Sequence, residues 1–313
     1  MIDQAGSHIP TPSPAAAGTA AAPARPERGE RPNRPGGQQR PDRPVRRATV
    51  VATERLGPDM VRVHLAGPDL AAIGQLINTD SYVKLLFPPP GAGYTMPFDP
   101  AQIRATLPRE QWPVTRTYTI RSHSPSAQRM AIDFVVHGDE GLAGPWAAAA
   151  SAGDQICFHG PGGGWAPPAD ADHLLLAGDE AAAPAIAAAL DALPDDARVR
   201  VFVEVADESA HLPLREMPGV KVSWVHRNQT GEPHGVALSR AVRAEPLSSG
   251  RVHAFIHGNA DMIKQLRGWL FVDNGVARED VSISGYWRTG QDEDGWQASK
   301  RDFVAAMEAE QGA

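Results

Sequence analysis

Apolar and polar side chains alternate along the chain from Arg46 onward, which is the pattern of strands with one buried face. The stretch 61–65 shows this alternation clearly, and Gly57-Pro58-Asp59 before it predicts a turn. In the stretch 130–136 the large apolar side chains share one face, as one wall of a small antiparallel barrel requires. Further strands are expected at 82–87, 117–121 and 155–159, with one alanine-rich helix at 144–152.

After Pro167-Pro168 the pattern changes to continuous apolar strands that alternate with amphipathic helices. A strand that is apolar on both faces must be covered on both sides, so this order predicts a parallel sheet between two layers of helices. Such a sheet is typical of nucleotide-binding domains. Strands are expected at 174–177, 199–205, 220–225 and 252–256, and helices at 184–193, 236–242 and 262–270.

These patterns divide the chain into three parts. Residues 1–44 are dominated by Pro, Ala, Gly and Arg and hold almost no large apolar side chains, so a disordered tail is expected. Residues 45–168 are expected to form the barrel domain, in which 88–113 predicts a long loop with at most a short helix. Residues 169–313 are expected to form the α/β domain with a C-terminal helix. The helical spacing of Trp296, Phe303 and Met307 predicts a core stripe on that helix.

The charge of the chain is distributed unevenly. Up to Arg47 the chain holds eight arginines against four acidic side chains, so this part has a net charge of +4 and the rest a net charge of −11. An acidic body disfavours binding to nucleic acid. Cys157 is the single cysteine, which excludes an internal disulfide and fits a cytoplasmic protein. No apolar run is long enough to predict a membrane span, and no histidine pair has the spacing of a metal site.

The strand expected at 117–121 carries most of a short motif, Arg116-Thr117-Tyr118-Thr119. Because side chains alternate along a strand, Arg116 and Tyr118 are expected on one face. A guanidinium suits a phosphate group and a flat aromatic ring suits a flavin, so the pair predicts a site for a flavin dinucleotide. Thr119 would offer its hydroxyl to the edge of the flavin ring near N5. An exposed Arg-Tyr pair without function is the alternative for so short a motif.

A glycine-rich turn, which runs from His137-Gly138 to Trp146, opens the helix expected at 144–152. Unpaired backbone N–H groups at a helix start suit a pyrophosphate, and glycine lets the backbone approach it closely. An ordinary turn between a strand and a helix is the alternative.

A second turn, Gly178-Asp179-Glu180, follows a buried strand of the expected parallel sheet. Ligands lie beyond the carboxyl ends of such strands, so a nicotinamide dinucleotide is expected there. The turn lacks the Gly-x-Gly-x-x-Gly pattern, and its two carboxylates suit a phosphate poorly. The turn 257–261 is expected nearby, with Asp261 as a helix cap.

Together with Tyr286-Trp287-Arg288-Thr289-Gly290, these three motifs resemble those of the siderophore-interacting proteins, which are flavin-dependent ferric-siderophore reductases. The resemblance spans roughly residues 46–300 and implies a FAD-binding barrel followed by an NAD(P)H-binding domain, as in the ferredoxin-reductase superfamily. It implies FAD as cofactor and a ferric siderophore as partner. The implied electron donor is NADPH or NADH, or in some members of the family ferredoxin. The residues that it and the motifs assign to cofactors are Arg116, Thr117, Tyr118, Thr119, His137, Ala143, Gly144, Gly178, Asp179 and Glu180, with Tyr118 and Thr119 also catalytic.

Ferric siderophores are often anionic, and the family uses basic side chains beside the flavin to bind them. The resemblance assigns this role to Lys84 in the strand 82–87, and to Lys300 and Arg301 on the last helix. An exposed, solvated helix face is the alternative for Lys300 and Arg301.

The resulting hypothesis is an oxidoreductase in which NAD(P)H gives a hydride to FAD and single electrons then pass to siderophore-bound ferric iron, releasing ferrous iron. One alternative is another flavoprotein reductase of the same superfamily that passes electrons to a protein or to free flavin. The other is a siderophore-binding flavoprotein without turnover.

Overall fold

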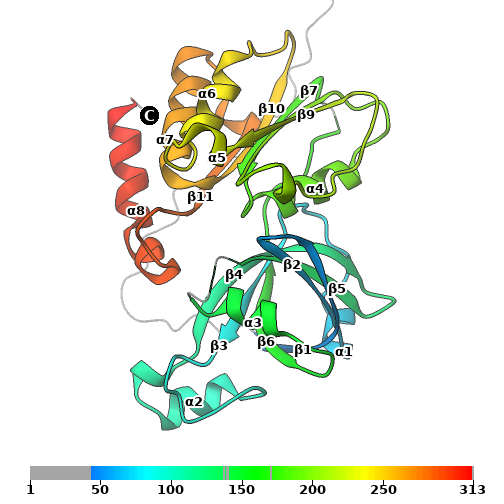
Figure 1. The fold of residues 1–313 in the computed structure, drawn as a ribbon, viewed down its shortest axis with the longest axis vertical. Coiled ribbons are helices and arrows are strands. Elements are labelled where there is room, and N and C mark those ends of the chain that lie inside the picture. Colours follow the sequence, from blue (N-terminus) through cyan, green and yellow to red (C-terminus); the bar gives the residue numbers. More distant parts are fainter. Residues whose placement is uncertain (1–43, 137, 139–140, 170, 312–313) are drawn as a thin grey trace, which may run out of the picture. The chain divides into compact units, whose positions relative to one another are not determined.

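The computed structural model describes residues 44–136, 138, 141–169 and 171–311, which form a barrel and a sheet with helices (Figure 1). The barrel is closed and antiparallel, and its strand order is β1-β2-β5-β4-β3-β6. The tail predicted at 1–44 lies outside the described residues apart from its last position. The barrel strands are β1 (Arg46–Gly57), β2 (Met60–Ala66), β3 (Tyr82–Phe87), β4 (Val114–Ser124), β5 (Arg129–Val135) and β6 (Gln155–Gly162).

The alternation of apolar residues fills the barrel interior. In the ladder between β2 and β5, Val63 lies opposite Ile132 and Val61 lies opposite Phe134. Residues directly opposite each other in a ladder share a face. All four side chains are buried in one apolar core, so the pattern that predicts the strands also forms the inner wall.

Short helices complete the barrel part of the chain. The helix α3 (Ala143–Ala149) packs on β5 through the ring of Trp146, whose centroid lies 5.6 Å from that of Phe134. The segment predicted as a long loop with a short helix contains α2 (Pro100–Thr106), whose first turn is capped by the Asp99 carboxylate. The other helical segments here are α1 (Pro68–Ala71) and a 3₁₀ turn at Arg109–Gln111.

The rest of the described chain forms a parallel sheet with the strand order β11-β10-β7-β8-β9. Its strands are β7 (His173–Asp179), β8 (Val199–Val205), β9 (Val220–His226), β10 (Val252–Asn259) and β11 (Val281–Trp287). Its helices are α4 (Ala183–Ala192), α5 (Arg227–Thr230), α6 (Val236–Ala244), α7 (Ala260–Gly268) and α8 (Glu293–Glu310). Shorter turns lie at Glu208–Ala210, Trp269–Asp273 and Arg278–Asp280.

Both faces of this sheet are covered, as the continuous apolar strands predict. Leu174 and Leu176 of β7 belong to a core with α4, whereas Leu175 and Ala177 belong to a core with α6 and α7. The stripe predicted on α8 is also confirmed, because Trp296 and Met307 are buried and Phe303 packs edge-on against Trp296. The fold class predicted from the sequence is therefore confirmed.

The strand β11 is an element that the sequence pattern did not predict. It pairs in parallel with β10 at the edge of the sheet, with Ile256 opposite Ile283. Ser282 and Ser284 interrupt its apolar residues, so it lacks the continuous apolar run of its neighbours.

The centre of the sheet holds a reversal of strand order. β7 lies between β8 and β10, and the chain proceeds outward from β7 first on one side and then on the other. In open α/β sheets such a reversal leaves a crevice beyond the carboxyl ends of the two central strands, which is where ligands bind. The turns after β7 and β10 therefore border the expected nucleotide site.

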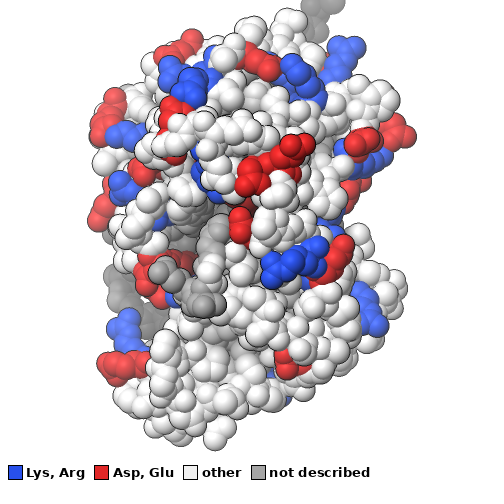
Figure 2. All heavy atoms as spheres, in the orientation of Figure 1, with Lys and Arg blue, Asp and Glu red and all other residues white. Residues whose placement is uncertain are grey.

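None of the helices in the described ranges has the length and apolarity that a membrane-spanning helix requires. On the face shown in Figure 2, Lys and Arg side chains are interspersed with Asp and Glu. This face does not form the continuous basic area that is typical of nucleic-acid binding.

Candidate functional site

The strand β4 carries the Arg-Thr-Tyr-Thr motif along its middle. In the ladder with β3, Arg116 lies opposite Leu85 and Tyr118 lies opposite Val83. Both β3 partners are buried in the barrel core, so Arg116 and Tyr118 share one face, as the alternation predicts. The ring of Tyr118 lies 4.4 Å from that of Phe134, centroid to centroid.

The hydroxyl of Tyr118 stays protonated in this environment. Burial raises its pKa, the nearby Glu293 carboxylate raises it further, and Arg116 partly opposes both. A neutral phenol can offer a flat ring face and an O–H donor, which are the two properties that a flavin contact uses.

The opposite face of β4 carries Thr117 and Thr119. Thr117 lies opposite Lys84 and Thr119 lies opposite Tyr82, so these four side chains share a face. Thr119 is buried, and Lys84 is half-buried.

The first turn of α8 contacts β4 directly. The Glu293 carboxylate accepts hydrogen bonds from the backbone N–H of Thr117 at 3.0 Å and from its hydroxyl at 2.7 Å. The Asp294 carboxylate lies 3.1 Å from Nη1 of Arg116, which also donates to the carbonyl of Thr115. These carboxylates were not among the predicted site residues, because about 180 residues separate them from the motif in sequence.

The contact between α8 and β4 brings two lysines together. Lys300 donates to the Ser284 hydroxyl at 2.9 Å and to the Gly285 carbonyl at 2.8 Å. Burial lowers the pKa of Lys300, and the positive charge of Lys84 lowers it further. The structure therefore places Lys84 and Lys300 close enough for their charges to interact.

Arg301 lies apart from this pair. Its side chain is exposed, and within the described ranges it makes no hydrogen bond or ion pair. The structure thus groups two of the three predicted substrate residues and leaves the third on the outer face of α8.

The start of α3 fits a phosphate group. Among the described residues, which leave out 137, 139 and 140, no side chain caps its first turn, so none of them is a capping partner for the N–H groups of Ala143 and Gly144. A Cβ atom at Gly144 would lie 3.3 Å from the carbonyl oxygen of Val135, so glycine allows this helix start to pack closely on the barrel. His137 lies outside the described residues. Cation, neutral aromatic ring and free donors are thus present on one barrel, and this set suits FAD.

The turn after β7 approaches β10 too closely for a side chain at Gly178. A Cβ atom there would lie 2.6 Å from the His257 carbonyl oxygen and 2.5 Å from Cβ of Ala182. The next residue, Asp179, is buried and accepts three hydrogen bonds, from the backbone N–H groups of Ala181 and Asn259 and from Nε1 of Trp287. Asp179 therefore joins the turns after β7, β10 and β11.

Glu180 has a different partner. Its carboxylate is buried and receives two hydrogen bonds from the Arg227 guanidinium, at 2.6 and 2.9 Å. Arg227 also lies 3.6 Å from the fully buried carboxylate of Glu204. The two carboxylates of the predicted nucleotide turn are thus bonded within the protein, and what the turn offers to a ligand is its backbone.

The turn after β10 lies beside the turn after β7, as expected, but its helix cap is another residue. Asn259, and not Asp261, is the N-cap of α7, and its side-chain oxygen accepts from the N–H groups of Asp261 and Met262. An N-cap must precede the first helical residue, and α7 begins earlier than the apolar pattern indicated.

The protonation of Asp179 should make stability depend on pH. Burial raises its pKa to about 7, with Glu180 adding to the shift, while the hydrogen bonds that it accepts oppose it. The unfolded value is about 3.9, so between these two values the folded state keeps a proton that the unfolded chain releases. The contribution of Asp179 is thus fully present below about pH 4 and is lost as the pH rises through about 7.

We therefore expect the wild type to lose stability relative to Asp179→Asn as the pH rises over this range, by up to about 1.4 kcal/mol per pH unit. Urea unfolding of both proteins at several pH values measures this difference, and other titrating groups cancel in it. A difference that is constant with pH would contradict the raised pKa of Asp179.

Two family models match the described chain. Residues 171–290 match the model for siderophore-interacting protein, and residues 49–165 match the siderophore-interacting FAD-binding domain. An uncharacterized protein of Mycobacterium tuberculosis (strain ATCC 25618 / H37Rv) is 41% identical over 275 residues, which cover 84% of this chain and 97% of that protein. The ferric vibriobactin reductase of Vibrio cholerae is 29% identical over 247 residues, covering 79% of this chain and 90% of that protein. The crystal structure of a siderophore utilization protein from T. fusca has a TM-score of 0.70 and 36% identity, covering 80% of this chain and 95% of that one.

Proposed function

We propose that this chain, which belongs to the siderophore-interacting protein family, is a ferric-siderophore reductase that holds FAD in its barrel and takes electrons from NADPH or NADH. The substrate is ferric iron held by a siderophore, and the product is ferrous iron. The relative from Vibrio cholerae is named a ferric vibriobactin reductase, which supports the reaction class. FAD supplies the electron-transfer chemistry when it is bound.

The observation that carries this proposal is the pair formed by Lys84 and Lys300. Burial lowers the pKa of Lys300, and the positive charge of Lys84 lowers it further, so the two half-buried ammonium groups repel each other. An anion between them would relieve the repulsion. Lys84 lies opposite Thr117 of the predicted flavin strand, so an anionic ferric chelate held by the pair would lie beside β4.

In this proposal the barrel holds FAD through two groups of residues. Arg116 pairs with a phosphate, Tyr118 lies against the flavin ring, and Thr119 offers its hydroxyl to the ring edge. Ala143 and Gly144 donate their backbone N–H groups to the diphosphate, for which the uncapped start of α3 is suited. Thr117 and His137 complete the proposed FAD contacts.

The electron donor is proposed to bind at the turns after β7 and β10, where the strand order reverses. Gly178 leaves the turn without a side chain, so a nicotinamide dinucleotide could approach its backbone closely. Asp179 and Glu180 hold the shape of the turn through Trp287 and Arg227, respectively. Their contribution to donor binding is therefore proposed to be one of positioning.

An anaerobic titration tests the proposal. NADPH or NADH added to the FAD-loaded protein should bleach the flavin absorbance, and a ferric siderophore added afterwards should restore it. A protein that binds the ferric chelate without restoring the colour would be a siderophore-binding flavoprotein, and the proposed activity would be wrong.

Replacing Lys84 with methionine should weaken the binding of anionic chelates selectively. Loss of one charge-assisted contact should raise KM for a trianionic ferric chelate by about 10- to 100-fold. A neutral ferric hydroxamate should be affected far less, and flavin content should not change. Steady-state kinetics with both chelates measures this effect, with Lys221→Met as the control, because Lys221 is exposed and pairs with Glu245 on the α/β domain. Equal losses with both chelates would argue against an electrostatic role of Lys84.

A further inference from the structure

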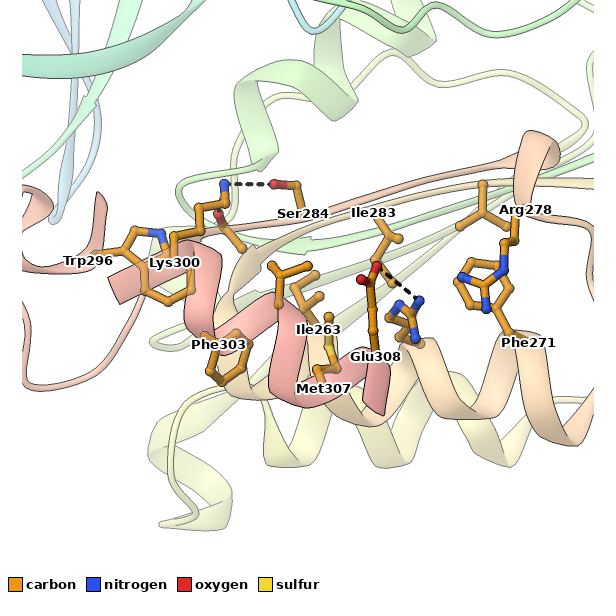
Figure 3. A pocket seen from close by; sticks show the side chains of 14 residues that line it. Ile263, Phe271, Arg278, Ile283, Ser284, Trp296, Lys300, Phe303, Met307 and Glu308 are labelled. Atoms are coloured by element: carbon orange, nitrogen blue, oxygen red, sulfur yellow. Dashed lines mark hydrogen bonds and ion pairs between the residues drawn. The ribbon is translucent and has the colours of Figure 1, made fainter. Parts of the chain in front are cut away.

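A cavity of about 230 Å³ lies between α8 on one side and α7 and β11 on the other (Figure 3). Its walls are about equally polar and apolar, and all three elements contribute to the apolar part. α8 contributes Phe303 and Met307, α7 contributes Ile263, and β11 contributes Ile283. The cavity is larger than the engineered cavity of about 150 Å³ in T4 lysozyme that binds benzene, so it has room for a small organic molecule.

One wall of the cavity is a buried guanidinium. The side chain of Arg267 is 5% exposed, and its carboxylate partner among the described residues is the half-exposed Glu308, whose Oε1 lies 3.6 Å from Nη2 of Arg267. Its Nη1 donates to the side-chain oxygen of Gln311 at 2.8 Å. A buried cation is stable only when it is well paired and hydrogen-bonded, and the contact with Glu308 is longer than a hydrogen bond. A second guanidinium, that of Arg278, lies over the ring of Phe271, which Arg267 also contacts.

The other end of the cavity also offers donors. Trp296 is 1% exposed, and its Nε1–H has no hydrogen-bond acceptor among the described residues. Lys300 lies beside it in Figure 3, and Glu308 lies nearer the other end of the cavity. With Arg267 and Arg278, the lining holds three cations against one carboxylate. The cavity therefore combines an apolar body with an excess of positive charge.

We propose that this cavity is a second ligand site, which binds a monocarboxylate with an apolar body of about eight carbon atoms. The carboxylate would bind to Arg267, and the apolar body would lie between α8 and β11 toward Trp296. This combination fits because the carboxylate completes the pairing of a buried arginine while the body fills apolar space. The cavity shares Lys300 with the proposed substrate pair, but its carboxylate-binding group is Arg267, and neither Lys84 nor the strand β4 lines it. The proposal therefore goes beyond the proposed reductase activity and does not depend on it.

The experiment is isothermal titration of the full-length protein with octanoate. Octanoate should bind with a Kd of about 1 mM or below, whereas octanamide, which lacks the charge, should bind at least about tenfold more weakly. Acetate, which lacks the apolar body, should show no binding at the same concentrations. Octanoate that fails to bind, or octanamide that binds equally well, would overturn the proposal.

Variants locate the bound carboxylate. Arg267→Met keeps the length of the side chain and should weaken octanoate binding by about tenfold or more. Val304 of α8 also lines the cavity. Val304→Trp fills the cavity without changing its charge and should abolish binding, which tests the site if Arg267→Met does not fold. Arg243→Met removes an exposed arginine from α6 and should leave octanoate binding unchanged.

Lys84→Met separates this site from the proposed substrate site. Octanoate binding should be unaffected by Lys84→Met. A different pattern would overturn the proposal: Arg267→Met and Val304→Trp bind octanoate with the affinity of the wild type, whereas Lys84→Met does not bind it. Octanoate would then lie between Lys84 and Lys300, and the cavity would not be a ligand site. Failure of the reductase assay would leave this titration unaffected.

Discussion

Replacing Arg227 with methionine is expected to lower the free energy of unfolding by about 3–5 kcal/mol, because it leaves buried carboxylates without their cation. Arg227 donates two hydrogen bonds to Glu180 and lies 3.6 Å from Glu204, and both carboxylates are buried. Methionine retains most of the apolar stem, so loss of packing contributes little. Urea unfolding at pH 7 measures the change.

Arg240→Met is the matched control. Arg240 also forms a two-bond pair with a glutamate, Glu232, but its side chain is 61% exposed. Water screens an exposed pair of this kind, so Arg240→Met should change the free energy of unfolding far less than Arg227→Met. If both variants lose a similar free energy of unfolding, the burial of Glu180 and Glu204 is not the reason why Arg227 stabilises the protein.

Replacing Arg116 with alanine is expected to weaken FAD binding by about 10- to 100-fold, which is the loss of one charge-assisted phosphate contact worth about 1.5–3 kcal/mol. Arg116 is held on β4 by the carbonyl of Thr115 and by Asp294, so its guanidinium is already oriented in the protein. Fluorescence titration of the flavin-free protein with FAD measures the affinity.

Arg121→Ala serves as the control for this strand. Arg121 belongs to the same strand, where the pairing with β5 shifts register, and its guanidinium pairs with Asp191 of α4 at 2.6 Å. FAD affinity should remain unchanged in this variant. Wild-type affinity in Arg116→Ala would remove Arg116 from the flavin site.

The fold could be predicted from the sequence because its signals are local. Alternation over a few residues places Val63 and Ile132 inside the barrel, and continuous apolar strands such as 199–205 require cover on both faces. β11 was not predicted because its serines weaken the apolar pattern, and because the neighbour that stabilises it, β10, lies more than twenty residues earlier in the chain.

The candidate site was predictable only where one element carries it. The shared face of Arg116 and Tyr118 follows from the geometry of one strand. The partners of Thr117 and Asp179 could not be predicted, because Glu293 and Trp287 lie 176 and 108 residues away along the chain. The structure thus adds tertiary contacts that no local pattern encodes. The most consequential is α8 against β4, which places Lys300 near Lys84.

The most direct test of the reductase proposal is steady-state ferrous production. The FAD-loaded protein, NADPH or NADH, and a ferric siderophore are combined without oxygen, and ferrous iron is trapped by a ferrous-specific dye. The account predicts continuous dye formation over many turnovers that requires protein, donor and FAD together. The protein used must retain FAD and bind the chelate. If it then forms the dye no faster than the mixture without protein, the account is contradicted.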